Sequence, residues 1–101
     1  MKLLRVGAFN QEIVATLDKD NKLRDLSSYI KDLNPSTFNE DNLQKLKKLN
    51  LSDLPEIKSS RIGSCFNKPT NYFCVGKNFH LHALEVGSKA PKDPMIFSKA
   101  I

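Results

Sequence analysis

Two histidines and a glutamate lie close together near the C-terminal end of the sequence and could take part in acid–base chemistry. His82 and Glu85 are three residues apart, so on a helix they share a face, whereas His80 falls on a different face. A carboxylate beside an imidazole fixes its tautomer, and the pair can take a proton from water or from an acidic carbon. Spacing alone favours the other interpretation, an exposed pair without a catalytic role. A metal site of His80, His82 and Glu85 has less support still.

A short helix over about residues 79–86 is expected to position this pair. Asn78 before it and Gly87 after it are typical start and stop residues. The apolar run over residues 71–76 predicts a strand buried on both faces, and residues 95–101 predict a second strand. The sequence therefore predicts the order strand, short helix, strand.

The first part of the sequence predicts a small antiparallel sheet with a packed helix. Apolar residues alternate at 4–6 and 13–17, and a short strand follows at 23–26. A turn at 7–10 and a second turn of polar residues at 18–21 separate the three. A helical turn or two is expected over residues 27–33. Asn39 can cap a helix over about residues 40–49, whose face of Leu43, Leu46 and Leu49 should be buried against the sheet. The predicted fold class is α+β.

The composition is that of a small globular protein. The chain has 101 residues, of which 40% are hydrophobic and 27% charged, so collagen-like and fully disordered classes are excluded. No apolar run is long enough to span a membrane, and an early charge argues against a signal peptide, so a cytoplasmic location and no membrane partner are expected. The net charge of +5 is spread along the chain, so nucleic acid is not an expected partner. A basic nucleic-acid binder, with steeply salt-dependent binding, is the weakest functional alternative.

The cysteines and acidic residues do not predict a metal site. Cys65 and Cys74 lack the closely paired spacing of a zinc site and are expected to be free, buried thiols. Most of the acidic residues are interpreted as solvated single charges in turns or at a helix start. Glu85 is the only acidic residue close to His82 in the sequence, and one carboxylate cannot hold Mg²⁺. No metal is therefore expected to bind to this chain alone.

Residues 73–87 resemble the signature stretch of the fumarylacetoacetate hydrolase family. In that family a strand ending in Gly leads to an Asn-aromatic pair, then two residues, His-Ala, one residue and Glu; the matching positions here are Gly76, Asn78, Phe79, His82, Ala83 and Glu85. Phe79 stands where Tyr is common. Residues 91–100 resemble the family's next segment, a Pro-rich loop running into Phe-x-Lys. Residues 1–5 and 24–27 are similar to the small N-terminal domain of bacterial members.

The resemblance implies a class of reaction and a role for several of the matched residues. Members similar to this chain include 2-hydroxyhepta-2,4-diene-1,7-dioate isomerases, acylpyruvate hydrolases and ureidoglycolate lyases, which use Mg²⁺ or Mn²⁺ to hold a keto or enol acid. His82 would be the base and Glu85 its orienting partner. Asn78 and Phe79 would shape the substrate pocket, and Lys99 would approach from the next strand. The family's metal ligands are acidic residues downstream of the Phe-x-Lys segment, and this sequence has no such group.

The resemblance also implies that the chain is divided into two domains. Residues 1–65 would form the small N-terminal domain, and residues 66–101 would form the start of a β-rich catalytic domain that is cut short. We therefore expect an N-terminal fragment of a metal-dependent hydrolase, lyase or isomerase, inactive alone. A homo-oligomer is expected, because an uncovered terminal strand can pair with another copy. The alternative is a stand-alone interaction module derived from the family, without catalysis.

Overall fold

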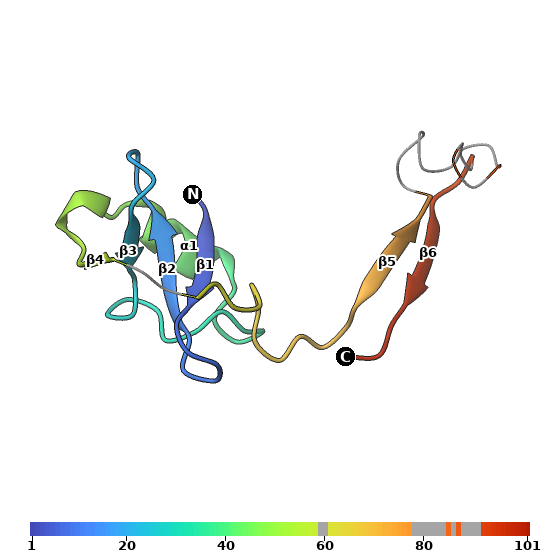
Figure 1. Ribbon diagram of the computed structural model, residues 1–101, viewed down its shortest axis with the longest axis horizontal. Coiled ribbons are helices and arrows are strands. Elements are labelled where there is room, and N and C mark those ends of the chain that lie inside the picture. Colours follow the sequence, from blue (N-terminus) through green and yellow to red (C-terminus); the bar gives the residue numbers. More distant parts are fainter. Residues whose placement is uncertain (59–60, 78–84, 86, 88–91) are drawn as a thin grey trace. The chain divides into compact units, whose positions relative to one another are not determined.

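The computed structural model describes residues 1–58, 61–77, 85, 87 and 92–101 (Figure 1). These residues form two compact units, Met1–Lys68 and Pro69–Ile101. Each unit contains its own antiparallel sheet, and the first also contains the helix α1, so the predicted α+β class is confirmed. Among the helices that the structure describes, none has the length and apolar character needed to cross a bilayer.

The sheet of the first unit has four strands in the order β1-β2-β3-β4, each antiparallel to its neighbour. The predicted three-stranded arrangement is confirmed, and β4 is an addition that the sequence did not indicate. β4 is only two residues long, too short to show an alternating pattern. The strands span Leu3–Val6 (β1), Ile13–Leu17 (β2), Leu23–Asp25 (β3) and Glu56–Ile57 (β4).

The two predicted turns between these strands are confirmed. Gly7 and Asn10, in the first turn, have positive φ angles of 129° and 62°, which Gly and Asn tolerate better than other residues. In the second turn Asn21 has a φ of 59°. The Asp18 carboxylate there accepts a hydrogen bond from the backbone N–H of Lys22 at 3.0 Å. Local residue chemistry therefore accounts for both chain reversals.

The helix α1 spans Glu40–Lys47, so it ends two residues earlier than the predicted 40–49. Its predicted cap is confirmed, because the Asn39 side chain accepts a hydrogen bond from the backbone N–H three residues on. Leu46 is buried, whereas Leu43 and Leu49 are half-buried. The expected apolar face is therefore present, but it is fully covered only at its centre. A short 3₁₀ helix, Leu51–Asp53, follows.

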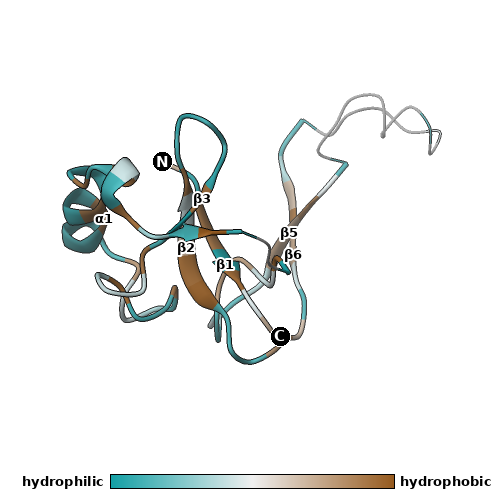
Figure 2. Cartoon of the chain, turned by 60° about the vertical axis from the view of Figure 1, so that its left-hand side comes forward, coloured by the Kyte–Doolittle hydropathy of each residue, from teal (hydrophilic) through white to brown (hydrophobic). Residues whose placement is uncertain are grey.

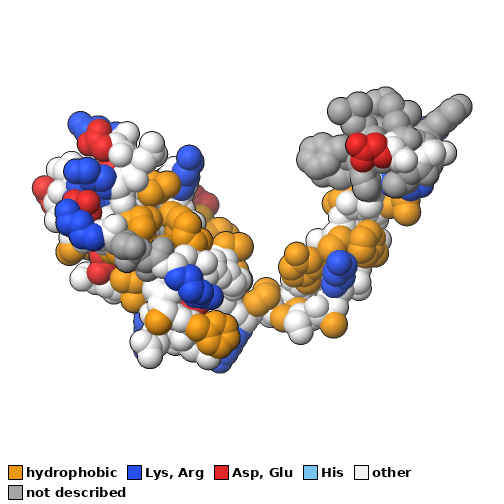
Figure 3. Space-filling model, viewed as in Figure 1, with side chains coloured by type: hydrophobic (Ala, Val, Ile, Leu, Met, Phe, Trp, Pro, Cys, Tyr) orange, Lys and Arg blue, Asp and Glu red, His pale blue; other side chains and the backbone are white. Residues whose placement is uncertain are grey.

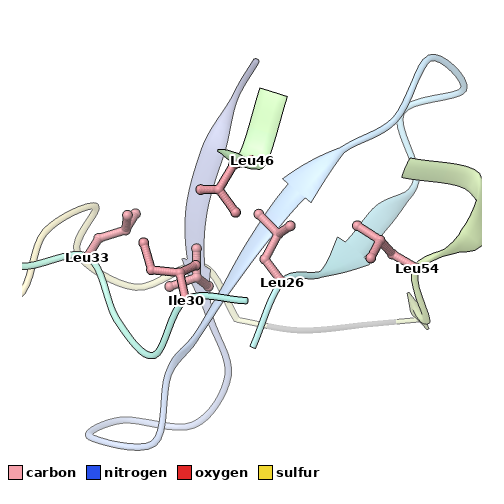
Figure 4. Close-up of a cluster of buried hydrophobic side chains, with 6 residues drawn as sticks. Leu26, Ile30, Leu33, Leu46 and Leu54 are labelled. Carbon is pink, nitrogen blue, oxygen red and sulfur yellow. The ribbon is translucent and has the colours of Figure 1, made fainter. Parts of the chain in front are cut away.

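The core of the first unit joins elements that are far apart in the sequence (Figure 4). Residues 26–33 contribute most to it, and they form one turn in which the Ile30 N–H donates to the Leu26 carbonyl, the shorter of the two predicted outcomes. Hydrophobic residues gather along β1 and β2, whereas α1 is largely hydrophilic on its outer side (Figure 2). The buried side chains of the cluster are Val14, Leu26, Ile30, Leu33, Leu46 and Leu54.

The second unit is a two-stranded antiparallel sheet of β5, Phe73–Gly76, and β6, Met95–Ser98. Both strands lie in the predicted stretches, but the expected burial of the first on both faces is wrong. Phe73, on β5, is 67% exposed, and Ile96, on β6, is 66% exposed. The physical reason is that, within the described residues, each strand has only the other as a neighbour in its sheet, so its apolar side chains stay exposed. Figure 3 shows hydrophobic side chains exposed on one face of this unit.

The prediction of buried cysteines is also wrong. Cys65 is exposed and Cys74 is half-buried, although both are free thiols as expected. Cys65 lies outside any strand, directly after Ser64, whose carbonyl accepts a hydrogen bond from Arg5 on β1. Cys74 lies on the uncovered strand β5. A small apolar side chain is buried only where a second layer covers it, and sequence pattern does not show that layer.

We expect the chain to associate with itself through β5 and β6 as its concentration rises. A two-stranded sheet with exposed apolar side chains and open edges is marginally stable alone and is a template for strand pairing. Sedimentation velocity should show an average mass that increases with concentration, and Ile96→Lys should reduce the increase. The matched control is Tyr29→Lys, which changes a 59% exposed side chain in the first unit and should have no effect. A chain that stays monomeric over the whole concentration range would contradict this prediction.

Candidate functional site

The predicted catalytic and substrate-binding residues fall on a segment that is only partly described. His82, Asn78 and Phe79 lie outside the described residues. Glu85 is exposed and its backbone is helical. Lys99 is exposed and follows the last residue of β6. The proposed pairing of His82 with Glu85 therefore stays a prediction.

The pairing of β5 with β6 fixes where the chain leaves and rejoins the sheet of the second unit. Gly76 is opposite Met95, and Phe73 is opposite Ser98. The chain therefore departs from one end of the two-stranded sheet after Gly76 and returns to the same end before Met95. The predicted His82–Glu85 pair lies in this connection, as does the Pro-rich stretch before β6.

Lys99 lies at the other end of this sheet. Its backbone N–H donates to the Tyr72 carbonyl at 2.9 Å, one pair beyond Phe73 and Ser98. Tyr72 and Gly76 are four positions apart, which is about 13 Å along a strand. The backbone of Lys99 therefore lies at the end of the sheet opposite the point where the chain leaves β5.

The described residues do not form a metal centre. Within the described ranges, no group of three or more His, Cys, Asp or Glu side chains is placed to hold one ion. Mg²⁺ requires near-octahedral oxygen coordination, usually with one or two carboxylates fixed toward it. The part of the chain that the structure describes therefore does not fit the ion that the family resemblance implies.

The first unit contains a partly buried ion pair that sequence reasoning missed. Arg5, on β1, is only 7% exposed. Its Nε donates to Asp32 Oδ1 at 2.6 Å, and its Nη1 donates to the Ser64 carbonyl at 3.1 Å. Asp32 Oδ2 also accepts a hydrogen bond from Asn67 Nδ2 at 2.7 Å. One guanidinium and one carboxylate thus connect the sheet to residues 61–67.

A second ion pair holds the start of the same segment. Arg61 Nη1 lies 2.8 Å from Glu12 Oε1, and Glu12 Oε2 lies 3.7 Å from Arg5 Nη2. The Arg61 guanidinium carbon also lies 5.8 Å from the centre of the Phe9 ring, in reach of a cation–π contact. The backbone adds a bond from the Gly63 N–H to the Arg5 carbonyl at 2.8 Å. Residues 61–67 are therefore fixed along β1 by side chains and backbone together.

These contacts correct the interpretation of the acidic residues as solvated charges. Burial acts to raise the pKa of Asp32, but hydrogen bonds from Arg5, Asn67 and a backbone N–H outweigh burial and hold that pKa below its usual value of 3.8. The hydrogen bond from Arg61 is the main cause that lowers the pKa of Glu12. The backbone N–H of Lys22 is the main cause that lowers the pKa of Asp18. Each of these carboxylates has a specific partner, often far away in the sequence.

The arrangement around Asp32 is suited to holding the fold and not to proton transfer. Both carboxylate oxygens accept hydrogen bonds, Oδ1 from Arg5 and from the Leu33 N–H, and Oδ2 from Asn67. A carboxylate with a lowered pKa and several donors is a weak base. Asp32 is therefore a structural residue, and the acid–base chemistry predicted for this chain stays with His82 and Glu85.

Comparison with known proteins gives a coarse functional class. No protein-family model matches the chain. Proteins from Burkholderia multivorans, Burkholderia lata and Burkholderia ambifaria, each named "Putative hydrolase", are 37%, 36% and 36% identical to it. Each match covers 98% of this chain and 36% of the relative, so the chain spans about a third of the length of the relatives it matches. The chain is thus similar to part of longer bacterial proteins that carry a hydrolase name.

Asp32→Asn should destabilise the first unit at neutral pH and weaken its acid sensitivity. The variant leaves Arg5 without its main anionic partner, which should lower the free energy of unfolding by about 1–3 kcal/mol. Because the pKa of Asp32 is lowered in the folded state, its contribution is present above pH 3.8 and is lost as the pH falls below that value. Urea unfolding between pH 7 and pH 2 measures both effects. Asp20→Asn, in an exposed turn, is the matched control, and equal acid sensitivity in the Asp32→Asn variant and the unaltered chain would refute the account.

Proposed function

We propose that this chain supplies the acid–base pair of a metal-dependent hydrolase, lyase or isomerase of the fumarylacetoacetate hydrolase family, acting on keto or enol acids. The observation that carries the proposal is the pairing of β5 with β6. It joins the two stretches that resemble the family, residues 73–87 and 91–100, into one antiparallel unit with Gly76 opposite Met95. The hydrolase names of the Burkholderia relatives agree with the coarser class.

In this proposal His82 is the base and Glu85 orients it. The Glu85 carboxylate would accept a hydrogen bond from the imidazole, which leaves the other ring nitrogen free to take a proton from water or from a substrate carbon. The turn at Asn78 and Phe79 would shape the substrate pocket. Lys99, which follows Ser98, would approach from the end of β6.

The metal must be considered separately, because the described residues do not fit it. The resemblance implies Mg²⁺ or Mn²⁺, which supplies charge stabilisation to an enolate when bound. Glu85 is the one carboxylate beside the proposed base, and a single carboxylate does not complete such a site. We therefore assign this chain the proton transfer alone, with residues 1–65 as the N-terminal domain and 66–101 as the start of a catalytic domain. Alone, the chain should be inactive.

A second candidate function is a stand-alone interaction module without catalysis. The observation that favours it is the exposure of apolar side chains on both β5 and β6, which suits a protein partner better than a small polar acid. A homo-oligomer is compatible with either function, and we propose a cytoplasmic location for both. The two functions differ in whether the chain can take part in turnover at all.

We expect the purified chain to show neither Mg²⁺ binding by calorimetry nor Mg²⁺-dependent hydrolysis of an acylpyruvate. A chimera in which this chain replaces the matched part of the Burkholderia multivorans relative should hydrolyse the acylpyruvate when Mg²⁺ is added. The unaltered relative is the control for the substrate, and circular dichroism is the control for folding.

Micromolar Mg²⁺ affinity or turnover by the chain alone would mean that residues interpreted as structural build a metal site. A folded chimera without turnover, beside an active relative, would favour the interaction module.

A further inference from the structure

A cavity of about 450 Å³ lies within the first unit, bordered by β1, the helix α1 and residues 61–67. Its volume falls in the range of about 300–1,000 Å³ that is usual for small-molecule sites. The cavity belongs entirely to the Met1–Lys68 unit, so it is separate from the segment that carries the predicted catalytic pair. Most of its wall is apolar, from the side chains of Met1, Leu3, Leu33, Phe38, Leu43 and Phe66.

Hydrogen bonds and ring packing hold the wall of this cavity in place. The rings of Phe38 and Phe66 meet edge to face, with centres 5.6 Å apart. The Ser64 hydroxyl donates to the Phe66 carbonyl at 3.0 Å, and the Asn67 N–H donates to the Leu33 carbonyl at 2.7 Å. Since Phe66 is fixed on both sides of its backbone, a ligand would meet a preformed wall and would not have to order it.

The polar lining groups decide which apolar ligand the cavity suits. Lys47, in the last turn of α1, is the cationic side chain among the lining residues, and Cys65 contributes a thiol. None of the described lining side chains is acidic. An apolar wall with one cation is complementary to a molecule that has an apolar body and one negative charge.

We propose that this cavity binds a small apolar carboxylate, with its aliphatic or aryl body between Phe38, Leu43 and Phe66 and its carboxylate toward Lys47. The site does not depend on His82 or Glu85. It would give the first unit a ligand of its own, beside any role in catalysis. The Cys65 thiol borders this ligand and offers a position at which the cavity can be filled by substitution.

The test is a titration of the full chain with octanoate, followed by ¹H–¹³C NMR of the lining side chains. We expect saturable shifts at Phe38, Leu43 and Phe66 with a dissociation constant of about a millimolar, appropriate to a ligand of this size. The uncharged analogue 1-octanol should bind more weakly, because it cannot pair with Lys47.

Two pairs of variants separate the effect of the Lys47 charge on binding from the effect of the space in the cavity. Lys47→Gln should weaken octanoate binding about two- to fivefold, the effect of one solvent-exposed ion pair, and should leave 1-octanol binding unchanged. Lys48→Gln alters an exposed lysine that does not line the cavity, and should change neither. Cys65→Trp should fill the cavity and abolish binding of both ligands, whereas Cys65→Ser should retain it.

Four results would overturn the proposal. They are the absence of shifts at these side chains, shifts confined to β5 and β6, octanoate binding that Lys47→Gln does not weaken, and shifts at Phe38 and Phe66 that follow protein concentration without ligand. The last result would assign this face to a second copy of the chain.

Discussion

The partly buried ion pair between Arg5 and Asp32 is the contact on which the arrangement of the Met1–Lys68 unit depends. Burying two charges costs desolvation free energy, which their attraction offsets only when the remaining donors and acceptors are also satisfied. Here the Ser64 carbonyl accepts from Arg5, and Asn67 donates to Asp32. Among the described residues that are not exposed, no buried side-chain nitrogen or oxygen atom is left without a hydrogen bond. The ion pair therefore holds residues 61–67, a segment of irregular chain, in place along β1.

That constraint explains how a small core supports a defined cavity. The core consists of a few aliphatic side chains from β2, residues 26–33, α1 and the chain before β4. Residues 61–67 run along its edge, held to β1 by Arg5 and to Leu33 by the Asn67 N–H. Phe66 thereby packs edge to face against Phe38, and both rings line the cavity together with residues of α1. The second unit has no comparable support, since β5 and β6 expose apolar side chains on both faces.

The sequence predicts local structure well and long-range partners poorly. Apolar alternation, turn residues and the Asn39 cap are sufficient to predict β1, β2, β3 and α1, because each of these signals lies within the element or directly beside it. Arg5 and Asp32 are 27 residues apart, and Arg61 and Glu12 are 49 residues apart, so no local pattern links them. The exposure of β5 was missed for a related reason, because an apolar run shows that a strand needs cover but not whether the cover is present.

The candidate site shows the same difference between local features, which the sequence predicts, and long-range ones, which it does not. The spacing of His82 and Glu85 predicts a pair on one face of a helix, and the family resemblance assigns it a role. The structure adds the register that joins the flanking stretches and the place of Lys99 beyond the end of β6. The metal ligands follow from neither, because the described residues contain no suitable group. The catalytic contribution that we propose for this chain is therefore limited to one base, His82, and the carboxylate of Glu85.

Turnover of an acylpyruvate by chimeras that carry His82→Ala or His80→Ala tests that contribution most directly. The chimera joins this chain to the remainder of the Burkholderia multivorans relative, and kcat is measured at saturating Mg²⁺. The account predicts that His82→Ala lowers kcat by about 10²- to 10⁴-fold, the usual effect of removing a general base. His80→Ala, the matched control, should keep most of the activity. Full turnover in the His82→Ala chimera would remove His82 from the mechanism and contradict the account.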